Sequence, residues 1–245
     1  MKKKIIKYSL EFLVIFLGIS LSFVINNWNE NKKRKIVEIK HLKELKSDIT
    51  ETLKEARSDE KLNILDIKSS IYLQDFFFQN ISYNDSLSYH FYRTTQHYQM
   101  YPKTSALESI KSIGLDIISN DSIRLRVTDF YQVHIQNLVD VGRVSQGQTN
   151  FANSLWPYFE KHFKPINKSI RKDNDWYSDT IYAKYPPKQW KVLDIVKLQK
   201  DYKLQLLLDK KMLDRQGSVA YSNRVIIKGE ELLKLISSEL MKYDN

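Results

Sequence analysis

An apolar run near the N-terminus constrains this chain more than any other feature of its sequence. Between Phe12 and Ile25 the chain reads FLVIFLGISLSFVI, fourteen residues without a charge, of which eleven are Phe, Leu, Val or Ile. Extended to Tyr8 and Trp28 the run has 21 residues. A helix of that length is about 31 Å long, close to the thickness of a bilayer core. The run therefore predicts a membrane-spanning helix.

The expected anchor has apolar side chains in its centre and one aromatic residue at each interface, where Tyr and Trp prefer to lie. Its residues are Tyr8, Phe12, Leu13, Val14, Ile15, Phe16, Leu17, Ile19, Leu21, Phe23, Val24, Ile25 and Trp28. Gly18 and Ser22 are candidates for a helix–helix contact, because small residues four apart let two membrane helices approach. The alternative is that these two small residues lie in a lone helix that makes no such contact.

A cleaved signal peptide is the competing explanation of the same run. The lysines before it suit such a peptide, and Ser20-Leu21-Ser22 resembles a cleavage site made of small residues. Cleavage there would remove only part of the apolar run and would leave Phe23-Val24-Ile25 at the new terminus. We therefore favour an uncleaved anchor.

The basic residues are concentrated on both sides of the apolar run. Residues 1–43 hold ten Lys or Arg and three Glu, so they carry +7 of the chain's net charge of +10. A nucleic-acid-binding domain should carry its excess charge on the folded body, so nucleic acid is not an expected partner. If their side is cytoplasmic, Lys32, Lys33, Arg34 and Lys35 are expected to contact anionic lipid headgroups.

The charge pattern does not fix the orientation of the chain, because basic residues lie on both sides and the positive-inside count is nearly balanced. Long domains cross the membrane largely regardless of charge, and a basic N-terminus before a first apolar helix is typical of a signal anchor. We expect a single-pass protein of a bacterial inner membrane, with its C-terminal body outside the cytoplasm.

The chain after Trp28 shows helical periodicity. One stripe recurs every three or four residues, at Ile36, Ile39, Leu42, Leu45, Ile49, Leu53 and Ala56. With no proline before Pro102, this helix is expected to continue to about Phe78 or to break near Ser58-Asp59. The next helix is expected over about 87–97.

Capping signals mark the helices that follow. Ser105 and Glu108 form a capping box at the start of a helix with Leu107, Ile110 and Ile113 on its apolar face, and Gly114 is its expected left-handed C-terminal cap. Asp121 is the expected N-cap of a helix reaching towards Trp156, with Pro157 and Pro165 ending it.

The last third of the chain combines a loop with a long helical pattern. Residues 167–188, with Pro186-Pro187, are expected to form a loop, and helix is expected from Trp190 to Leu240 with a break at Gly217. No strand alternation is visible. The predicted fold is all-α: one N-terminal transmembrane helix, then a long helix and an antiparallel helical bundle. The predicted segments are a basic tail (1–7), the transmembrane helix (8–28), a basic juxtamembrane segment (29–43) and the bundle (44–245).

The sequence offers no catalytic constellation. It has no cysteine, and it lacks a glycine-rich phosphate loop and the G-x-S-x-G motif. His90 and His97 are seven residues apart, whereas helical metal pairs are three or four apart, and His134 is expected to be a hydrogen-bonded core residue. The acidic loop at Asp173, Asp175 and Asp179 has Ser178 and Lys184 where a calcium loop needs glycine and glutamate. We therefore expect no metal, no cofactor and no enzyme.

Nine aromatic residues are concentrated between Phe76 and Tyr101. A hydrophobic core is the first explanation for them. A binding surface is the second, because tyrosine suits recognition sites.

Two stretches of the chain resemble a known family. The first is Ile25-Asn26-Asn27-Trp28-Asn29-Glu30 with the basic cluster after it. The second runs from Thr104 to Gly114 (TSALESIKSIG) and on to Asn120-Asp121-Ser122-Ile123-Arg124 and Phe130-Tyr131. Together they resemble DUF6090, an uncharacterised family of small single-pass membrane proteins from Bacteroidota. The resemblance implies a membrane helix and a helical body, and it brings no activity with it.

The function expected from the sequence is a non-enzymatic binding or sensing module at the membrane surface, with an envelope or membrane protein as its partner. One alternative is a structural or scaffold protein that acts as a homodimer through Gly18 and Ser22. Another is a cytoplasm-facing protein whose basic segment binds anionic lipid.

Overall fold

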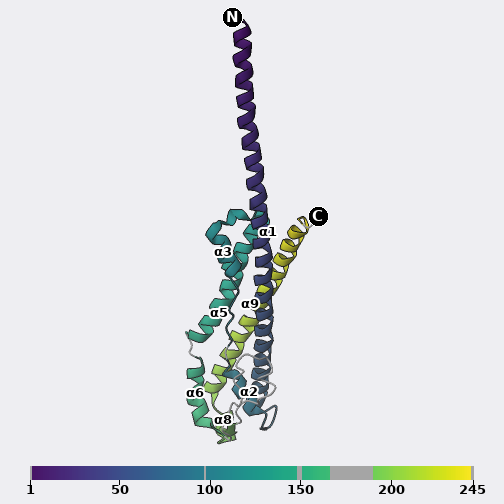
Figure 1. Ribbon diagram of the computed structural model, residues 1–245. Coiled ribbons are helices and arrows are strands. Elements are labelled where there is room, and N and C mark those ends of the chain that lie inside the picture. Colours follow the sequence, from purple (N-terminus) through teal and green to yellow (C-terminus); the bar gives the residue numbers. More distant parts are fainter. Residues whose placement is uncertain (1, 97, 148–150, 166–189, 244–245) are drawn as a thin grey trace. The chain divides into compact units, whose positions relative to one another are not determined.

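The computed structural model describes residues 2–96, 98–147, 151–165 and 190–243, which are mostly helical (Figure 1). The elements in chain order are α1 (Lys2–Phe77), α2 (Leu87–Thr94), α3 (Ser105–Ile113), the 3-10 turn η1 (Leu115–Ile117), α4 (Asp121–Asp129), the π-helical segment η2 (Phe130–Ile135), α5 (Gln136–Gly147), α6 (Phe151–His162), β1 (Phe163–Pro165), β2 (Trp190–Val192), α8 (Ile195–Gln199) and α9 (Tyr202–Met241). The expected loop at 167–188, with its acidic residues, and His97 lie outside the described residues.

The chain divides into two compact units. Unit 1 consists of residues 1–49, 103–127 and 232–245, and unit 2 consists of residues 50–102 and 128–231. Both α1 and α9 contribute residues to each unit.

Helix α1 is continuous from the apolar run to Phe77. It does not break at Ser58-Asp59, and the prediction of one long helix to about residue 78 is confirmed. The predicted stripe is correct from Leu42 onward, but Ile36 is 61% exposed. The buried pattern begins instead at Glu38 and continues at 42, 45, 49, 52 and 56. Hydrophobicity alone predicts Ile36 and Ile39 on the buried face of this part of the helix, whereas the buried residue there is Glu38.

Helix α9 has the same kind of buried pattern. Between Leu204 and Ile236 its buried positions are 204, 208, 211, 215, 218, 222, 225, 229, 232 and 236, with spacings that alternate between four and three. This is the heptad spacing of helices that pack side by side along their length. The predicted break at Gly217 is wrong, because Gly217 lies inside the continuous helix.

The start of the last helical region also differs from the prediction. Residues Trp190–Val192 form β2, which pairs antiparallel with β1 so that Phe163 lies opposite Val192. Two aspartates then start separate helices. Asp194 caps α8 by accepting from the backbone N–H of Lys197, and Asp201 accepts from the N–H of Leu204 at the start of α9. These side-chain caps offer the backbone an alternative to one continuous helix.

The prediction that Pro157 ends its helix is wrong, because Pro157 lies inside α6. Its side chain is on the exposed face. A carbonyl group left without a helical donor on that face can bind water, so the helix continues to His162.

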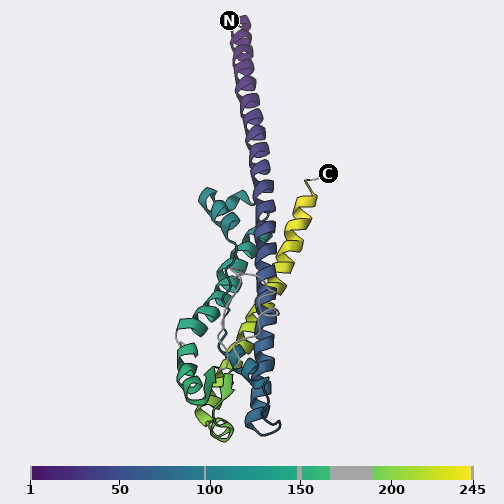
Figure 2. The ribbon, with the colours of Figure 1, turned by 60° about the horizontal axis from the view of Figure 1, so that its bottom comes forward.

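Within unit 2, α1 and α9 run in opposite directions. Arg57 pairs with Glu230 at 2.5 Å, and Gln74 donates to Asp209 at 2.7 Å, so residue numbers rise along one helix as they fall along the other. Figures 1 and 2 show the two helices side by side in both views. Gly229 lies where they approach closely, because a Cβ at this position would be 2.5 Å from a methyl carbon of Leu53.

The contact between α1 and α9 in unit 2, named here the seam, contains a cluster of buried charges. Asp66 accepts from Arg93 of α2 at 2.7 Å and lies 3.2 Å from the Nε of Arg215 of α9. Arg215 also donates to Asn63 at 3.0 Å, and Lys211 donates to the carbonyl of Gln96 at 3.2 Å. Burial raises the pKa of Asp66, and the guanidinium groups of Arg215 and Arg93 oppose that shift. Burial also lowers the pKa of Lys211 to about 7, since desolvation disfavours its charge.

Besides the charge cluster, unit 2 contains a hydrophobic core that is rich in aromatic side chains. Its rings include Phe76, Phe77, Phe91, Phe159 and Phe163, and the centroids of Phe91 and Phe163 are 4.8 Å apart. The core explanation of the aromatic concentration is therefore confirmed for Phe76, Phe77 and Phe91. Phe78 and Tyr101, in contrast, are 69% and 67% exposed.

Removing the Asp66 carboxylate is expected to destabilise the protein strongly. Asp66→Ala leaves two buried guanidinium groups without their counter-ion, a change that typically costs about 3–5 kcal/mol. Thermal and urea unfolding of the full-length protein in detergent, followed by circular dichroism, measures the loss. Lys68→Ala, on the exposed side of the same helix, is the matched control and should change stability by less than about 0.5 kcal/mol. Equal effects of the two changes would contradict the proposed importance of the cluster.

Asp201 should make unit 2 sensitive to acid. Burial alone would raise its pKa, but hydrogen bonds from Lys161 (2.7 Å), His162 (2.8 Å) and the N–H of Leu204 together lower it to about 2. Since the folded-state pKa lies below the ordinary value of 3.8, the stabilisation is complete above pH 3.8 and disappears as the pH falls towards 2. Asp201→Asn should therefore lower the melting temperature at pH 6 and have little effect at pH 2. A difference between the two proteins that does not change with pH would rule this out.

Candidate functional site

The site described here is built in unit 1, where the segment after the apolar run meets the α3–α4 connection. Its first part is the start of α3. Ser105 is the first residue of that helix, and its hydroxyl donates to Asp48 of α1 at 2.9 Å. The backbone N–H of Ala106 donates to the same Asp48 oxygen at 2.8 Å.

The predicted capping box is therefore wrong. The residue at the N-cap position is Thr104, which makes no side-chain cap hydrogen bond, and Glu108 pairs with Lys111 at 2.9 Å instead of reaching back. A carboxylate from α1 satisfies the helix start, and a motif confined to four consecutive residues cannot reveal such a cap. Ile113, predicted on the apolar face, is 51% exposed.

Gly114 ends α3, as predicted, with φ +105°. Its ψ of 132° places it in an extended conformation that only glycine adopts readily, and not in the left-handed helical one. A Cβ here would also collide with the carboxylate of Asp116. Glycine is therefore required for the turn that carries Asp116.

The cap of α4 is Asn120, one residue before the predicted Asp121. The Asn120 side-chain oxygen accepts from the N–H groups of Ser122 (3.0 Å) and Ile123 (3.3 Å). Its amide nitrogen donates to Glu239 of α9 at 2.7 Å. Asp121 pairs with Arg124 instead.

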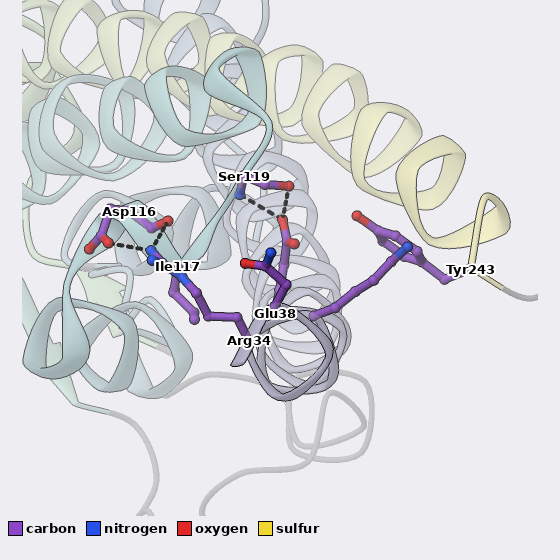
Figure 3. A pocket seen from close by; sticks show the side chains of 8 residues that line it. Arg34, Glu38, Asp116, Ile117, Ser119 and Tyr243 are labelled. Atoms are coloured by element: carbon purple, nitrogen blue, oxygen red, sulfur yellow. Dashed lines mark hydrogen bonds and ion pairs between the residues drawn. The ribbon is translucent and has the colours of Figure 1, made fainter. Parts of the chain in front are cut away.

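These elements surround an open pocket of about 390 Å³, named here the Arg34 pocket (Figure 3). Its walls come from α1, from the connection between α3 and α4, and from the end of the chain after α9. The lining residues are Asn31, Arg34, Lys35, Glu38, Asp116, Ile117, Ser119 and Tyr243.

Two carboxylates hold the α3–α4 connection against α1. Arg34 forms an ion pair with the Asp116 side chain and donates to its carbonyl oxygen at 3.1 Å. Both partners are more than half exposed, so this pair adds little stability. Glu38 is only 4% exposed, and one of its oxygens accepts from both the N–H and the hydroxyl of Ser119 at 2.7 Å. The Glu38 contact is the stronger of the two.

The third wall is Tyr243. The ammonium group of Lys35 lies 4.6 Å from the centre of the Tyr243 ring, a cation–π contact. The Tyr243 hydroxyl donates to Glu239 at 3.4 Å. Burial raises the pKa of Tyr243, and the negative charges of Glu38 and Glu239 act in the same direction. The pKa of Glu239 is lowered, first by its hydrogen bond from Lys242 and also by the one from Asn120.

The charged groups of the Arg34 pocket hold the segments that form its walls in position. Its formal charges balance, with Arg34 and Lys35 against Glu38 and Asp116, and these groups interact with one another or with the surrounding chain. Across the described part of the chain, no three His, Asp or Glu residues lie together in a way that could hold a metal ion. The geometry links the segment that follows the apolar run to both the α3–α4 connection and the end of α9.

The predicted anchor residues lie on the surface of α1. Phe12, Leu13, Val14, Ile15, Phe16, Leu17, Ile19, Leu21, Phe23, Val24, Ile25 and Trp28 are each 50–70% exposed, and the Tyr8 side chain lies outside the described part. Among the described residues, one helix is long and apolar enough to cross a membrane, and this segment of α1 makes it so. Ser22 donates to the carbonyl of Gly18 at 2.9 Å, and both line a shallow groove on the helix.

The structure separates the four predicted headgroup residues into two pairs. Lys32 lies 5.5 Å from the Trp28 ring centre, and Lys33 is exposed. Arg34 and Lys35 line the pocket. Sequence reasoning did not identify Glu38, Asp116, Ser119 or Tyr243. For Glu38 there was a signal, because it precedes Leu42 and Leu45 at the same heptad spacing.

Neither His134 nor His90 is among the residues that line the Arg34 pocket. His134 is partly buried and bonds to Asp129 at 3.0 Å, five residues earlier, across η2. His90 stacks on Tyr72 with ring centres 4.2 Å apart and bonds to Ser69. Burial lowers the pKa of His90.

A protein-family model matches residues 11–181, which include the apolar run, the basic segment and the α3–α4 connection. The chain belongs to DUF6090, a family of unknown function. Searches of curated proteins and of solved structures find no match to this DUF6090 chain. Its function must therefore be argued from its own residues.

Glu38 and Asp116 are expected to differ in their effect on the α3–α4 connection. Glu38→Ala removes two charge-assisted hydrogen bonds, and about 1–3 kcal/mol of local stability should be lost. Asp116→Ala removes an exposed ion pair that contributes less than about 1 kcal/mol. Hydrogen–deuterium exchange of the full-length protein, read on peptides covering residues 115–123, should show faster exchange for Glu38→Ala than for Asp116→Ala. The opposite order would contradict this description of the site.

Proposed function

We propose that this protein is a single-pass, membrane-anchored, non-enzymatic binding or sensing module at a membrane surface. The observation that carries the proposal is the exposure of the whole apolar run on a continuous helix. A bilayer would cover these side chains. At about −0.3 to −0.6 kcal/mol each near the helix centre, eleven of them favour insertion by several kcal/mol.

In this proposal residues 1–7 are a basic tail, 8–28 cross the membrane and 29–43 form the juxtamembrane segment. Residues 44–245 form the helical body, an antiparallel bundle in which α9 packs along α1. The body lies outside the cytoplasm, on the outer side of a bacterial inner membrane. Its partner is an envelope or membrane protein.

A sensing role is supported by the position of the Arg34 pocket. Arg34 is six residues after Trp28, which is about 9 Å along a helix. A movement of the membrane helix would therefore reach Arg34, Lys35 and Glu38 directly, because no break separates them from the anchor. These residues contact both the α3–α4 connection and Tyr243.

A second candidate function is supported by Lys32 and Lys33. Both are exposed within two helical turns of Trp28. If this side is cytoplasmic, each contributes about 1 kcal/mol to contact with anionic lipid. In that case the segment is a lipid-binding collar.

Alkaline carbonate extraction of membranes tests the anchor. The wild-type chain should stay in the membrane pellet. Leu17→Arg combined with Leu21→Arg should move it to the supernatant, because each arginine costs about 2.5–3.5 kcal/mol at a helix centre and two outweigh the gain from the apolar residues. Lys32→Gln combined with Lys33→Gln is the control and should stay in the pellet. Extraction of the wild-type chain would refute the anchor.

The orientation is tested separately, with C-terminal reporters that are active on only one side of the membrane. Activity of the outside reporter supports the envelope module. Activity of the inside reporter rejects it in favour of the lipid-binding collar.

A further inference from the structure

The outward faces of α1 and α9 in unit 2 differ in chemistry. In a helix with heptad spacing, the position two residues after a seam residue such as 52 or 204 points away from the seam. On α1 these positions are Lys54, Lys61 and Lys68, all exposed, as expected for a face in water.

On α9 the equivalent positions are apolar. They are Leu206, Leu213, Ala220 and Ile227, named here the α9 spine, and all four are exposed. Leu206 and Leu213 are each 63% exposed and Ile227 is 54% exposed. The spine is widened by the partly exposed Met212, Val219 and Ile226, each one residue before a spine residue.

The spacing of the spine identifies the kind of partner. Apolar residues scattered singly on a surface need no explanation, but these recur every seven residues over three heptads. A strict seven-residue repeat faces one direction only when a helix supercoils about another helix. The spine therefore fits a helix.

We propose that the α9 spine is the interface of a parallel homodimer, formed with the α9 spine of a second copy. This rests on the proposed membrane anchor, which holds two copies in one orientation and concentrates them in the membrane plane. A second copy presents the same heptad repeat at the same height, so each spine residue meets its own counterpart. Ala220, with Gly217 close to it, allows a close approach in the middle.

The charges beside the spine favour the parallel arrangement. The positions three after each spine residue are Asp209, Gln216, Asn223 and Glu230, with a net charge of −2. The positions four after are Lys210, Gly217, Arg224 and Glu231, with a net charge of +1. Within the chain Glu230 is already paired with Arg57 of α1, so Asp209, which accepts from Gln74, supplies the remaining negative charge of the first flank. In a parallel two-fold pair this flank of one copy faces the basic flank of the other, whereas an antiparallel pair places like flanks together.

Cysteine cross-linking tests the proposal directly, because the natural chain has no cysteine. Four single variants of the full-length protein carry the probe on the spine: Leu206→Cys, Leu213→Cys, Ala220→Cys and Ile227→Cys. Lys61→Cys on α1 and Asn223→Cys beside the spine are the matched exposed controls. Membranes containing each variant are treated with a mild oxidant, and dimers are read on a non-reducing gel.

All four spine variants are expected to form disulfide dimers several-fold more readily than both controls, because equivalent residues of a parallel pair lie within disulfide reach. Dimers no more abundant on the spine than at the controls would overturn the proposal. So would dimers at Leu213→Cys and Ala220→Cys without any at Leu206→Cys and Ile227→Cys, since that pattern belongs to an antiparallel pair.

A second variant tests the energy of the contact. Leu213→Asp combined with Ile227→Asp, in the Ala220→Cys background, should abolish the cross-link while leaving the circular dichroism spectrum unchanged, because both positions are exposed. An undiminished cross-link would overturn the proposal. Carbonate extraction of the membranes that contain the four single spine variants separates the two hypotheses. A single spine variant that stays in the pellet but does not cross-link refutes the dimer alone, whereas one that is released refutes the anchor and with it the parallel pair.

Discussion

In unit 2, the carboxylate of Asp66 on α1 faces guanidinium groups from two other helices, Arg93 on α2 and Arg215 on α9. All three side chains are almost completely buried. Removing one partner from such a cluster leaves an uncompensated charge in the interior, so the three helices depend on one another. The cluster also selects the register of α1 against α9. A slip by one heptad would keep the spacing of the seam but place Asp66 opposite Ser222 or Leu208 instead of Arg215.

The seam that this cluster fixes is made by helices that also enter unit 1. There, side chains distant in sequence satisfy the backbone. Asp48 caps α3, Glu38 binds Ser119, and Glu239 accepts from the cap residue Asn120. Each of these carboxylates lies on α1 or α9. The Arg34 pocket thus forms where two long helices hold a short connection, and its polar groups keep these segments in place.

Both α1 and α9 have heptad spacing in unit 2, but their outward faces differ in chemistry. The lysines of α1 suit water, while the spine of α9 repeats the apolar pattern of a buried seam. Heptad spacing on opposite sides of one helix means that α9 has two directions in which it can pack. The first is used within the chain, and the proposed homodimer uses the second.

The sequence by itself determined the apolar run, the helical class and a helical stripe after Trp28, because composition and periodicity act through neighbours on the same helix. It left open a break near Ser58-Asp59, and the structure decided for one continuous helix. The sequence also identified Gly114, since a chain reversal after a helix needs a residue free to adopt positive φ. Tertiary structure decided the caps. Asp48 replaces the Ser105 box, and Asn120, held by Glu239, replaces Asp121. It also divided the basic cluster, placing Arg34 and Lys35 in a pocket whose other walls lie about 80 and 200 residues further along the chain. Those contacts depend on which surfaces meet in space, and no pattern within one segment carries that information.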